Sequence, residues 1–81
     1  MFTLYILYSK SLDSYYTGYT NSLERRLTEH NRKKGKYTDA GIPWLLVYSE
    51  TYRTKKEAML RERYIKSKKS RSYITELVNR R

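Results

Sequence analysis

The sequence contains no cysteine, one proline and three glycines, and it lacks any long apolar run. Without cysteine, neither disulfide bonds nor a thiolate metal site can supplement a small core. No segment approaches the roughly 20 apolar residues that a membrane-spanning helix needs. Residues 1–9, MFTLYILYS, are too short and too aromatic for a secretory signal peptide. We therefore expect a cytoplasmic protein that has no membrane partner and depends on side-chain burial.

Acidic residues are also scarce, with 8 Asp and Glu against 18 Lys and Arg and a formal net charge of +10. A strongly basic domain is typical of nucleic-acid binders, although anionic membranes and ribosomes also attract such a charge. The ten tyrosines could stack on bases, but most are expected to fill the sheet and the core. A chain of 81 residues is long enough for a single domain over 1–81.

The hydrophobic pattern predicts an α+β fold of order β-β-α-β-α-α, in which helices flank a small three-stranded antiparallel sheet. Residues 2–8 should place alternate side chains on opposite faces of a strand. The third strand is apolar enough at its start to favour a central position. The expected strands are 2–8, 15–19 and 44–52, and the expected helices are 22–32, 55–67 and a short last helix that carries Ile74, Leu77 and Val78.

Two helix starts carry capping signals. Asn21 and Glu24 form a plausible capping pair for the first helix, and Thr54 with Glu57 forms a capping box for the second.

Polar side chains share the apolar face of the first predicted helix. At about 100° per residue, Leu23, Leu27 and His30 span a narrow arc with Arg26 at its edge. A histidine in such a place is usually a hydrogen-bonded core residue, and an arginine usually extends to solvent. The structural and the functional interpretation both remain open for each residue alone.

The second predicted helix repeats this arrangement with a carboxylate. Glu62 lies between Ala58 and Ile65 on one helix face. An unpaired buried charge is costly, so Glu62 should be paired, bound to a metal or placed at a cleft. Pairing with Arg26 would make both residues structural.

A carboxylate, a guanidinium, an imidazole and two strand tyrosines, Tyr5 and Tyr16, could converge between the hairpin and the helices. Phosphodiester hydrolysis uses such a set: a carboxylate-bound metal polarises the phosphate, an arginine neutralises its growing charge, and a proton acceptor activates water. Gly18, on the same strand face as Tyr16, would let another group approach the backbone.

Four segments then resemble the GIY-YIG nuclease superfamily. They are LYI (4–6), YTG (16–18), NSLERRLTEH (21–30) and TKKEAMLRERYIKSKK (54–69). The similarity extends over about residues 2 to 69. It is closest to small stand-alone URI-type domains, which are similar to the N-terminal nuclease domain of the repair endonuclease UvrC.

The resemblance implies a role for five residues. Tyr5 and Tyr16 match the tyrosines of the two tripeptides, and Arg26 matches the arginine that contacts phosphate. His30 matches the histidine one turn later, and Glu62 matches the ligand of one divalent cation, Mg²⁺ or Mn²⁺. Which tyrosine activates water is left open, because a phenol with a pKa near 10 is a poor base at neutral pH.

The sequence departs from the family pattern at Leu4, where glycine is usual, and at Thr17, where isoleucine is usual. The late asparagine of many relatives is not transferred to Asn79. Relatives with defined targets carry a separate DNA-binding domain, which we do not expect here, so the domain itself should hold DNA. The predicted phosphate contacts are Arg32, Lys33, Lys34, Lys36, Lys66, Lys68, Lys69 and Arg71.

The sequence therefore predicts a metal-dependent DNA endonuclease that is structure-selective or weakly specific, acts in repair or recombination, and needs no small-molecule cofactor. The alternatives are a catalytically inactive nucleic-acid-binding module and an RNA- or ribosome-associated protein. Geometry discriminates between them, because an enzyme should bring the five residues together.

Overall fold

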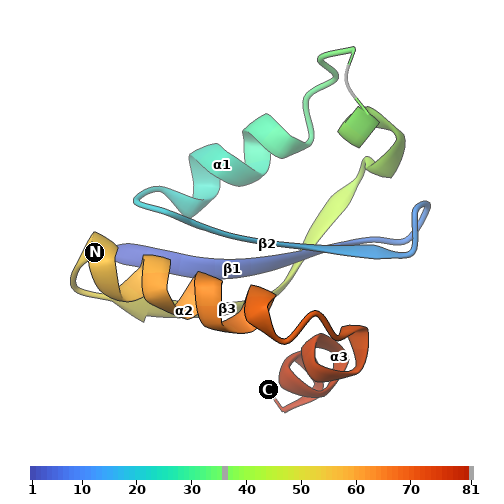
Figure 1. Ribbon diagram of the computed structural model, residues 1–81. Helices are drawn as coiled ribbons and strands as arrows, with labels where there is room; N and C mark the ends of the chain where they lie inside the picture. Colours follow the sequence, from blue (N-terminus) through green and yellow to red (C-terminus); the bar gives the residue numbers. More distant parts are fainter. Residues whose placement is uncertain (36, 81) are drawn as a thin grey trace.

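The computed structural model, which describes residues 1–35 and 37–80, has a three-stranded antiparallel sheet with helices on both faces (Figure 1). The α+β class and the order β-β-α-β-α-α are confirmed. The strands lie in the order β2-β1-β3, so β1 is central. The elements are β1 (Phe2–Ser9), β2 (Ser14–Thr20), α1 (Leu23–His30), a 3₁₀ helix η1 (Tyr37–Gly41), β3 (Trp44–Tyr52), α2 (Lys55–Ser67) and α3 (Arg71–Asn79).

The central strand β1 is buried on both faces, as its alternation predicts. Leu4 and Ile6 pack with Ile65 in a core under α2 and α3. Tyr5 and Leu7 point to the opposite face, where they belong to a second core beside α1. The sheet thus separates two small apolar clusters, and α1 lies on one side of it while α2 and α3 lie on the other (Figure 1).

Strand β3 is an edge strand, so the prediction that it is central was wrong. Leu45 and Leu46, in its apolar first half, are 53% and 36% exposed. The register shifts there, since Ile6 pairs with Tyr48 while Leu7 pairs with Leu46. An apolar run does not determine strand order; the pairing of β1 with both neighbours does.

The predicted Asn21–Glu24 cap of α1 was also wrong. The N-cap is Ser22, whose side chain makes no capping hydrogen bond. The Asn21 Oδ1 atom instead accepts a hydrogen bond from Arg25 Nη2 at 3.2 Å. The backbone N–H of Ser22 donates a hydrogen bond to the Thr20 hydroxyl oxygen at 3.1 Å, so the chain enters α1 through a local turn.

Helix α2 begins as predicted, because the Thr54 hydroxyl accepts a hydrogen bond from the Glu57 N–H at 3.2 Å. At the start of α3 the Ser70 hydroxyl accepts from the Tyr73 N–H at 3.2 Å. These side chains satisfy N–H groups that have no partner within their helices. Within residues 1–35 and 37–80, every helix is too short or too polar to cross a bilayer.

Helix α2 is fixed to β3 by a hydrogen-bonded group that we call the Glu50 cluster, made of Tyr48, Glu50, Tyr52 and Arg61. Arg61 Nε and Nη2 donate to the two Glu50 carboxylate oxygens at 3.0 and 3.1 Å. The Tyr48 and Tyr52 hydroxyls also donate to Glu50. Burial raises the pKa of Glu50, but the bonds from Arg61 and the tyrosines outweigh it and lower that pKa overall.

Candidate active site

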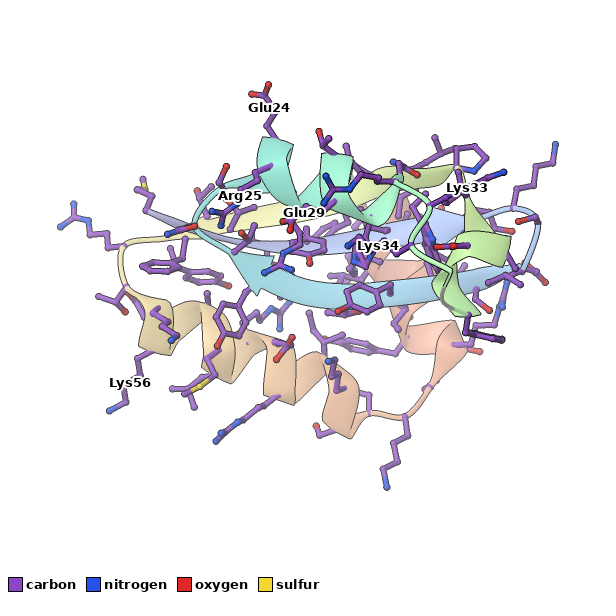
Figure 2. The ribbon with its side chains drawn as sticks, turned by 90° about the horizontal axis from the view of Figure 1, so that it is seen from above. Glu24, Arg25, Glu29, Lys33, Lys34 and Lys56 are labelled. Carbon is purple, nitrogen blue, oxygen red and sulfur yellow. The ribbon has the colours of Figure 1, made fainter. Side chains whose placement is uncertain are left out.

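The five residues predicted to form the site come from four elements around strand β2. Tyr5 lies on β1, Tyr16 on β2, Arg26 and His30 on α1, and Glu62 on α2. Seen from above in Figure 2, α1 lies over the β3 side of the sheet, α2 lies beside β2, and β2 is seen between them. Glu62 therefore approaches from the helix beside β2, while the other four share the α1 face.

Gly18 makes room for Tyr5. The two residues are paired across β1 and β2. A Cβ at Gly18 would lie 2.7 Å from the Tyr5 hydroxyl oxygen and 3.2 Å from the Tyr16 ring. The rings of Tyr5 and Tyr16 are stacked with centroids 6.3 Å apart. The prediction that a group approaches the backbone at this glycine is confirmed, and that group is the phenol of Tyr5.

The pKa of Tyr5 responds to charged side chains from both α1 and α2. Tyr5 is 2% exposed, and its pKa is raised to about 12, first by burial and then by Tyr16. The charge of Arg26 lowers this pKa, and those of Glu62 and Glu29 raise it. These three charges must lie within electrostatic reach of one phenol, although Glu62 comes from a helix on the other side of the sheet.

His30 lies against Tyr16. Their ring centroids are 4.5 Å apart in an edge-on arrangement, and the Trp44 ring lies 6.0 Å from His30. Burial lowers the pKa of His30 below its ordinary 6.5, and the positive charges of Lys34 and Arg26 lower it further. The imidazole is therefore neutral at pH 7 and can accept a proton.

Arg26 is half-buried and incompletely bonded. Its Nε atom is buried and has no hydrogen-bond partner among residues 1–35 and 37–80. Glu62, considered above as its partner, forms an ion pair with Lys66 instead, with Nζ and Oε2 3.4 Å apart. A buried polar atom without a partner is costly, and such atoms in native structures are found at strained or catalytic positions.

Glu62 fits a single-cation site completed by substrate. The described part of the chain contains no cluster of three His, Cys, Asp or Glu side chains that could enclose a metal. Mg²⁺ is commonly held by one or two carboxylates together with water and substrate phosphates. Glu62 is a half-buried carboxylate whose charge acts on the pKa of Tyr5, and one such carboxylate is compatible with that mode of binding.

In the first predicted group of phosphate contacts, Lys34 acts on a site residue. Arg32, Lys33 and Lys34 are exposed on the loop after α1, and Figure 2 shows Lys34 over the sheet. The effect of Lys34 on His30 places its charge close to that imidazole. Lys36 lies outside the described residues.

In the second predicted group, Arg71 has a structural partner. Its Nη2 atom lies 2.6 Å from Asp13 Oδ1, which also accepts a hydrogen bond from the Tyr8 hydroxyl at 2.7 Å. Asp13 is in the left-handed region, with φ of 50°. Arg71 thus fixes the start of α3 to the hairpin turn.

The three lysines of that group differ in their contacts. Lys66 pairs with Glu62, and Lys68 Nζ lies 4.5 Å from the centre of the Tyr64 ring. Lys69 is exposed on the turn before α3 and has a φ of 45°. Their role in binding nucleic acid stays a prediction.

The sequence interpretation missed the link that holds His30 in place. The Trp44 N–H donates to Asn31 Oδ1 at 2.6 Å, and Asn31 Nδ2 donates back to the Trp44 carbonyl at 3.1 Å. This exchange joins the end of α1 to the start of β3. An asparagine directly after a helix was the available signal, but its partner lies 13 residues away.

Comparisons with known proteins give consistent matches over most of the chain. The profile described as "GIY-YIG catalytic domain" matches residues 1–75. A UPF0213 protein of Bacillus licheniformis is 49% identical over 67 residues, covering 78% of this chain and 69% of the relative. UPF0213 protein YazA of Bacillus subtilis is 45% identical and covers 83% and 72%. The solution NMR structure of a UPF0213 protein from Bacillus halodurans has 40% identity and a TM-score of 0.61, covering 98% and 84%.

Proposed function

This chain belongs to the GIY-YIG catalytic domain family, and on that premise we propose that it is a metal-dependent DNA endonuclease. The family implies a nuclease that acts on DNA. The observation that carries the proposal is that Tyr5, Tyr16 and His30 lie together, with ring centroids 6.3 Å apart for the two tyrosines and 4.5 Å apart for Tyr16 and His30. Gly18 provides the space that this arrangement needs.

In the proposed reaction Arg26 binds the scissile phosphate. Arg26 is only half-buried as a residue, and the planar fork of its guanidinium matches phosphate geometry. As water attacks, negative charge grows on the phosphate oxygens, and a preorganised donor stabilises that charge.

The two tyrosines receive different roles. Tyr5, with a pKa of about 12 and 2% exposure, is assigned to positioning. Tyr16 is 38% exposed and contacts the neutral imidazole of His30, so this pair is assigned as the proton acceptor. The water oxygen bonds to phosphorus and the bond to the leaving oxygen breaks. The proton of the water passes to the Tyr16–His30 pair, and the leaving oxygen takes a proton from solvent.

Glu62 would hold one divalent cation, Mg²⁺ or Mn²⁺, as a carboxylate ligand. When bound, such a cation supplies Lewis-acid polarisation of the phosphate and its leaving oxygen.

The proposed substrate is branched, nicked or damaged DNA in repair or recombination, acted on in the cytoplasm by residues 1–81 as one domain. Exposed lysines and arginines on both sides of the site would contact phosphates. Such contacts give affinity but little sequence information, so selection should depend on DNA shape.

The test is cleavage of plasmid, flap and junction DNA with Mg²⁺ or Mn²⁺, comparing the protein with Glu62→Gln and Glu76→Gln. Both glutamates form i,i+4 ion pairs, Glu62 with Lys66 and Glu76 with Arg80. We expect Glu62→Gln alone to abolish cleavage. If all DNA stays intact and only salt-dependent binding remains, the protein is a binding module and the enzymatic proposal is wrong.

A further inference from the structure

An open groove of ≈ 450 Å³ runs between β2 and the turn that joins α2 to α3. It lies on the side of β2 that faces α2, and most of it is separate from the five site residues. Its size is within the range of small-molecule pockets. It is lined by Ser14, Tyr15, Tyr16, Thr17, Ile65, Lys66, Lys69, Ser70, Arg71 and Ile74.

The floor of the groove is mostly apolar. Ile65 is buried in the core under α2 and α3, and Tyr15 and Ile74 pack against that core while partly exposed. The Arg71 guanidinium lies over the Tyr15 ring, with its Cζ 5.4 Å from the ring centroid. A planar guanidinium beside aliphatic side chains offers a surface on which a nucleobase can stack.

The rim of the groove is basic. Lys66, Lys69 and Arg71 line it, and none of the described lining residues is acidic. Arg71 is held by Asp13, whereas Lys69 is exposed at its left-handed position. Clustered cations over an apolar floor are complementary to a nucleotide, which combines an aromatic base with an anionic phosphate.

The groove adjoins the candidate active site at two points. Tyr16 lines the groove and also contacts Tyr5 and His30. Lys66 lines the groove and pairs with Glu62 at 3.4 Å. A DNA strand bound at Tyr16 and Glu62 can therefore continue along β2 into the groove.

We propose that this groove seats one unpaired nucleotide next to the scissile phosphate. Its base would lie against Ile74 and the Arg71 guanidinium that stacks over Tyr15, and its phosphate near Lys66 and Lys69. A base inside a duplex is stacked and paired, so it reaches such a groove only after extrusion. This inference rests on the proposed nuclease function and makes it narrower: the preferred substrate is DNA with an unpaired nucleotide at the cleavage point.

Binding without cleavage tests the groove separately. A thymidine tetranucleotide is titrated into ¹⁵N-labelled Glu62→Gln protein without metal, and a fully paired hairpin serves as the comparison. We expect the tetranucleotide to shift the amide signals of residues 14–17 and 65–74. Shifts confined to the loop at residues 32–35, or equal shifts with the paired hairpin, would overturn the proposal.

Matched variants separate the groove from general charge. Lys69→Gln and Lys56→Gln each remove one exposed lysine, and Lys56 lies at the far end of α2 (Figure 2). We expect Lys69→Gln to weaken tetranucleotide binding about three- to tenfold and Lys56→Gln to have much less effect. Equal losses in the two variants would overturn the proposal. Ile74→Phe, which fills the groove from its floor, should weaken binding with the lysines intact.

The cleavage assay distinguishes the two proposals. Groove binding with no cleavage by the unsubstituted protein would support the groove and reject the nuclease. Cleavage whose preference for unpaired over paired substrates is unchanged in Lys69→Gln would support the nuclease and reject the groove.

Discussion

Two groups of side chains in this molecule contain the same residue types but differ in how their charges are paired. The Glu50 cluster has two tyrosines, one arginine and one glutamate. Tyr5, Tyr16, Arg26 and Glu62, here called the open group, have the same composition. The neighbouring residues Arg61 and Glu62 on α2 belong to different groups. Residue type alone therefore does not separate a structural set from a functional one.

The two groups differ in whether their charged side chains bond to each other. In the Glu50 cluster the arginine binds the carboxylate with two hydrogen bonds, and both tyrosine hydroxyls donate to it. In the open group, Arg26 Nε has no partner within the described chain and Glu62 pairs with Lys66. A polar group that is left without a partner inside the fold is expected at a functional site rather than at a structural one. The Glu50 cluster should support stability and the open group catalysis.

The largest expected effect is the loss of cleavage in Arg26→Ala. Removing one preorganised donor to a developing charge lowers the rate by about 10²–10³-fold. The melting temperature should change little, because the lost guanidinium satisfies no described partner at Nε. Cleavage kinetics and circular dichroism on the same sample check both statements. A large fall in melting temperature would place Arg26 with the structural groups.

Arg61→Ala is expected to lower stability and to leave cleavage intact. Leaving the Glu50 carboxylate without its arginine should lower the free energy of unfolding by about 2 kcal/mol, less than for a fully buried pair. For a domain of this size that lowers the melting temperature by about 8–16 °C. Cleavage measured well below the transition should be retained. An unchanged melting temperature would contradict the structural role of the Glu50 cluster.

Gly18→Ala should disturb the open group by geometry alone. The added Cβ would lie 2.7 Å from the Tyr5 hydroxyl oxygen, so the ring must move. Displacements near 1 Å can reduce rates by about 10², and we expect at least a tenfold loss. Gly35→Ala is the control, since a Cβ added there would meet no atom within 4 Å in the described part of the chain beyond its sequence neighbours. Its left-handed backbone should affect stability without shifting the NMR signals of Tyr5.

The smallest effect concerns the only histidine. Burial, Lys34 and Arg26 lower the pKa of His30, so its NMR titration should have a midpoint below 6.5. Lys34→Gln should raise that midpoint and Lys56→Gln should not. Because the folded pKa is depressed, the unfolded chain binds the proton first. The stability contributed by neutral His30 is present above pH 6.5 and is lost as pH falls toward the folded pKa. A midpoint above 6.5 would contradict the placement of Lys34.

Much of the fold could be predicted because it depends on local patterns. Strand β3 and helix α2 match their predicted ranges, and the side chains of β1 alternate between two cores. The two errors involve competition between partners. Asn21 binds Arg25 rather than a helix N–H, and an apolar strand lies at an edge. Local periodicity does not determine which partner is bound.

The candidate site could be predicted as a set of residues but not as a set of contacts. Glu62 was expected to need a partner, and that partner is Lys66 rather than Arg26. Arg71 was assigned to phosphate binding, yet it pairs with Asp13, 58 residues away in the chain. The Asn31–Trp44 exchange went unpredicted because such pairs form only where distant elements meet.

The sequence by itself determined which segments form strands and helices, and which faces carry Tyr5, Tyr16, Arg26, His30 and Glu62. Backbone periodicity and side-chain chemistry are local, so they can be read along the chain. Only the tertiary structure decided that the charges of Arg26 and Glu62 both affect the pKa of Tyr5, and that Glu50 forms its ion pair with Arg61. The physical reason is that ion pairing and pKa depend on distance and burial, which exist only once the sheet and helices have packed.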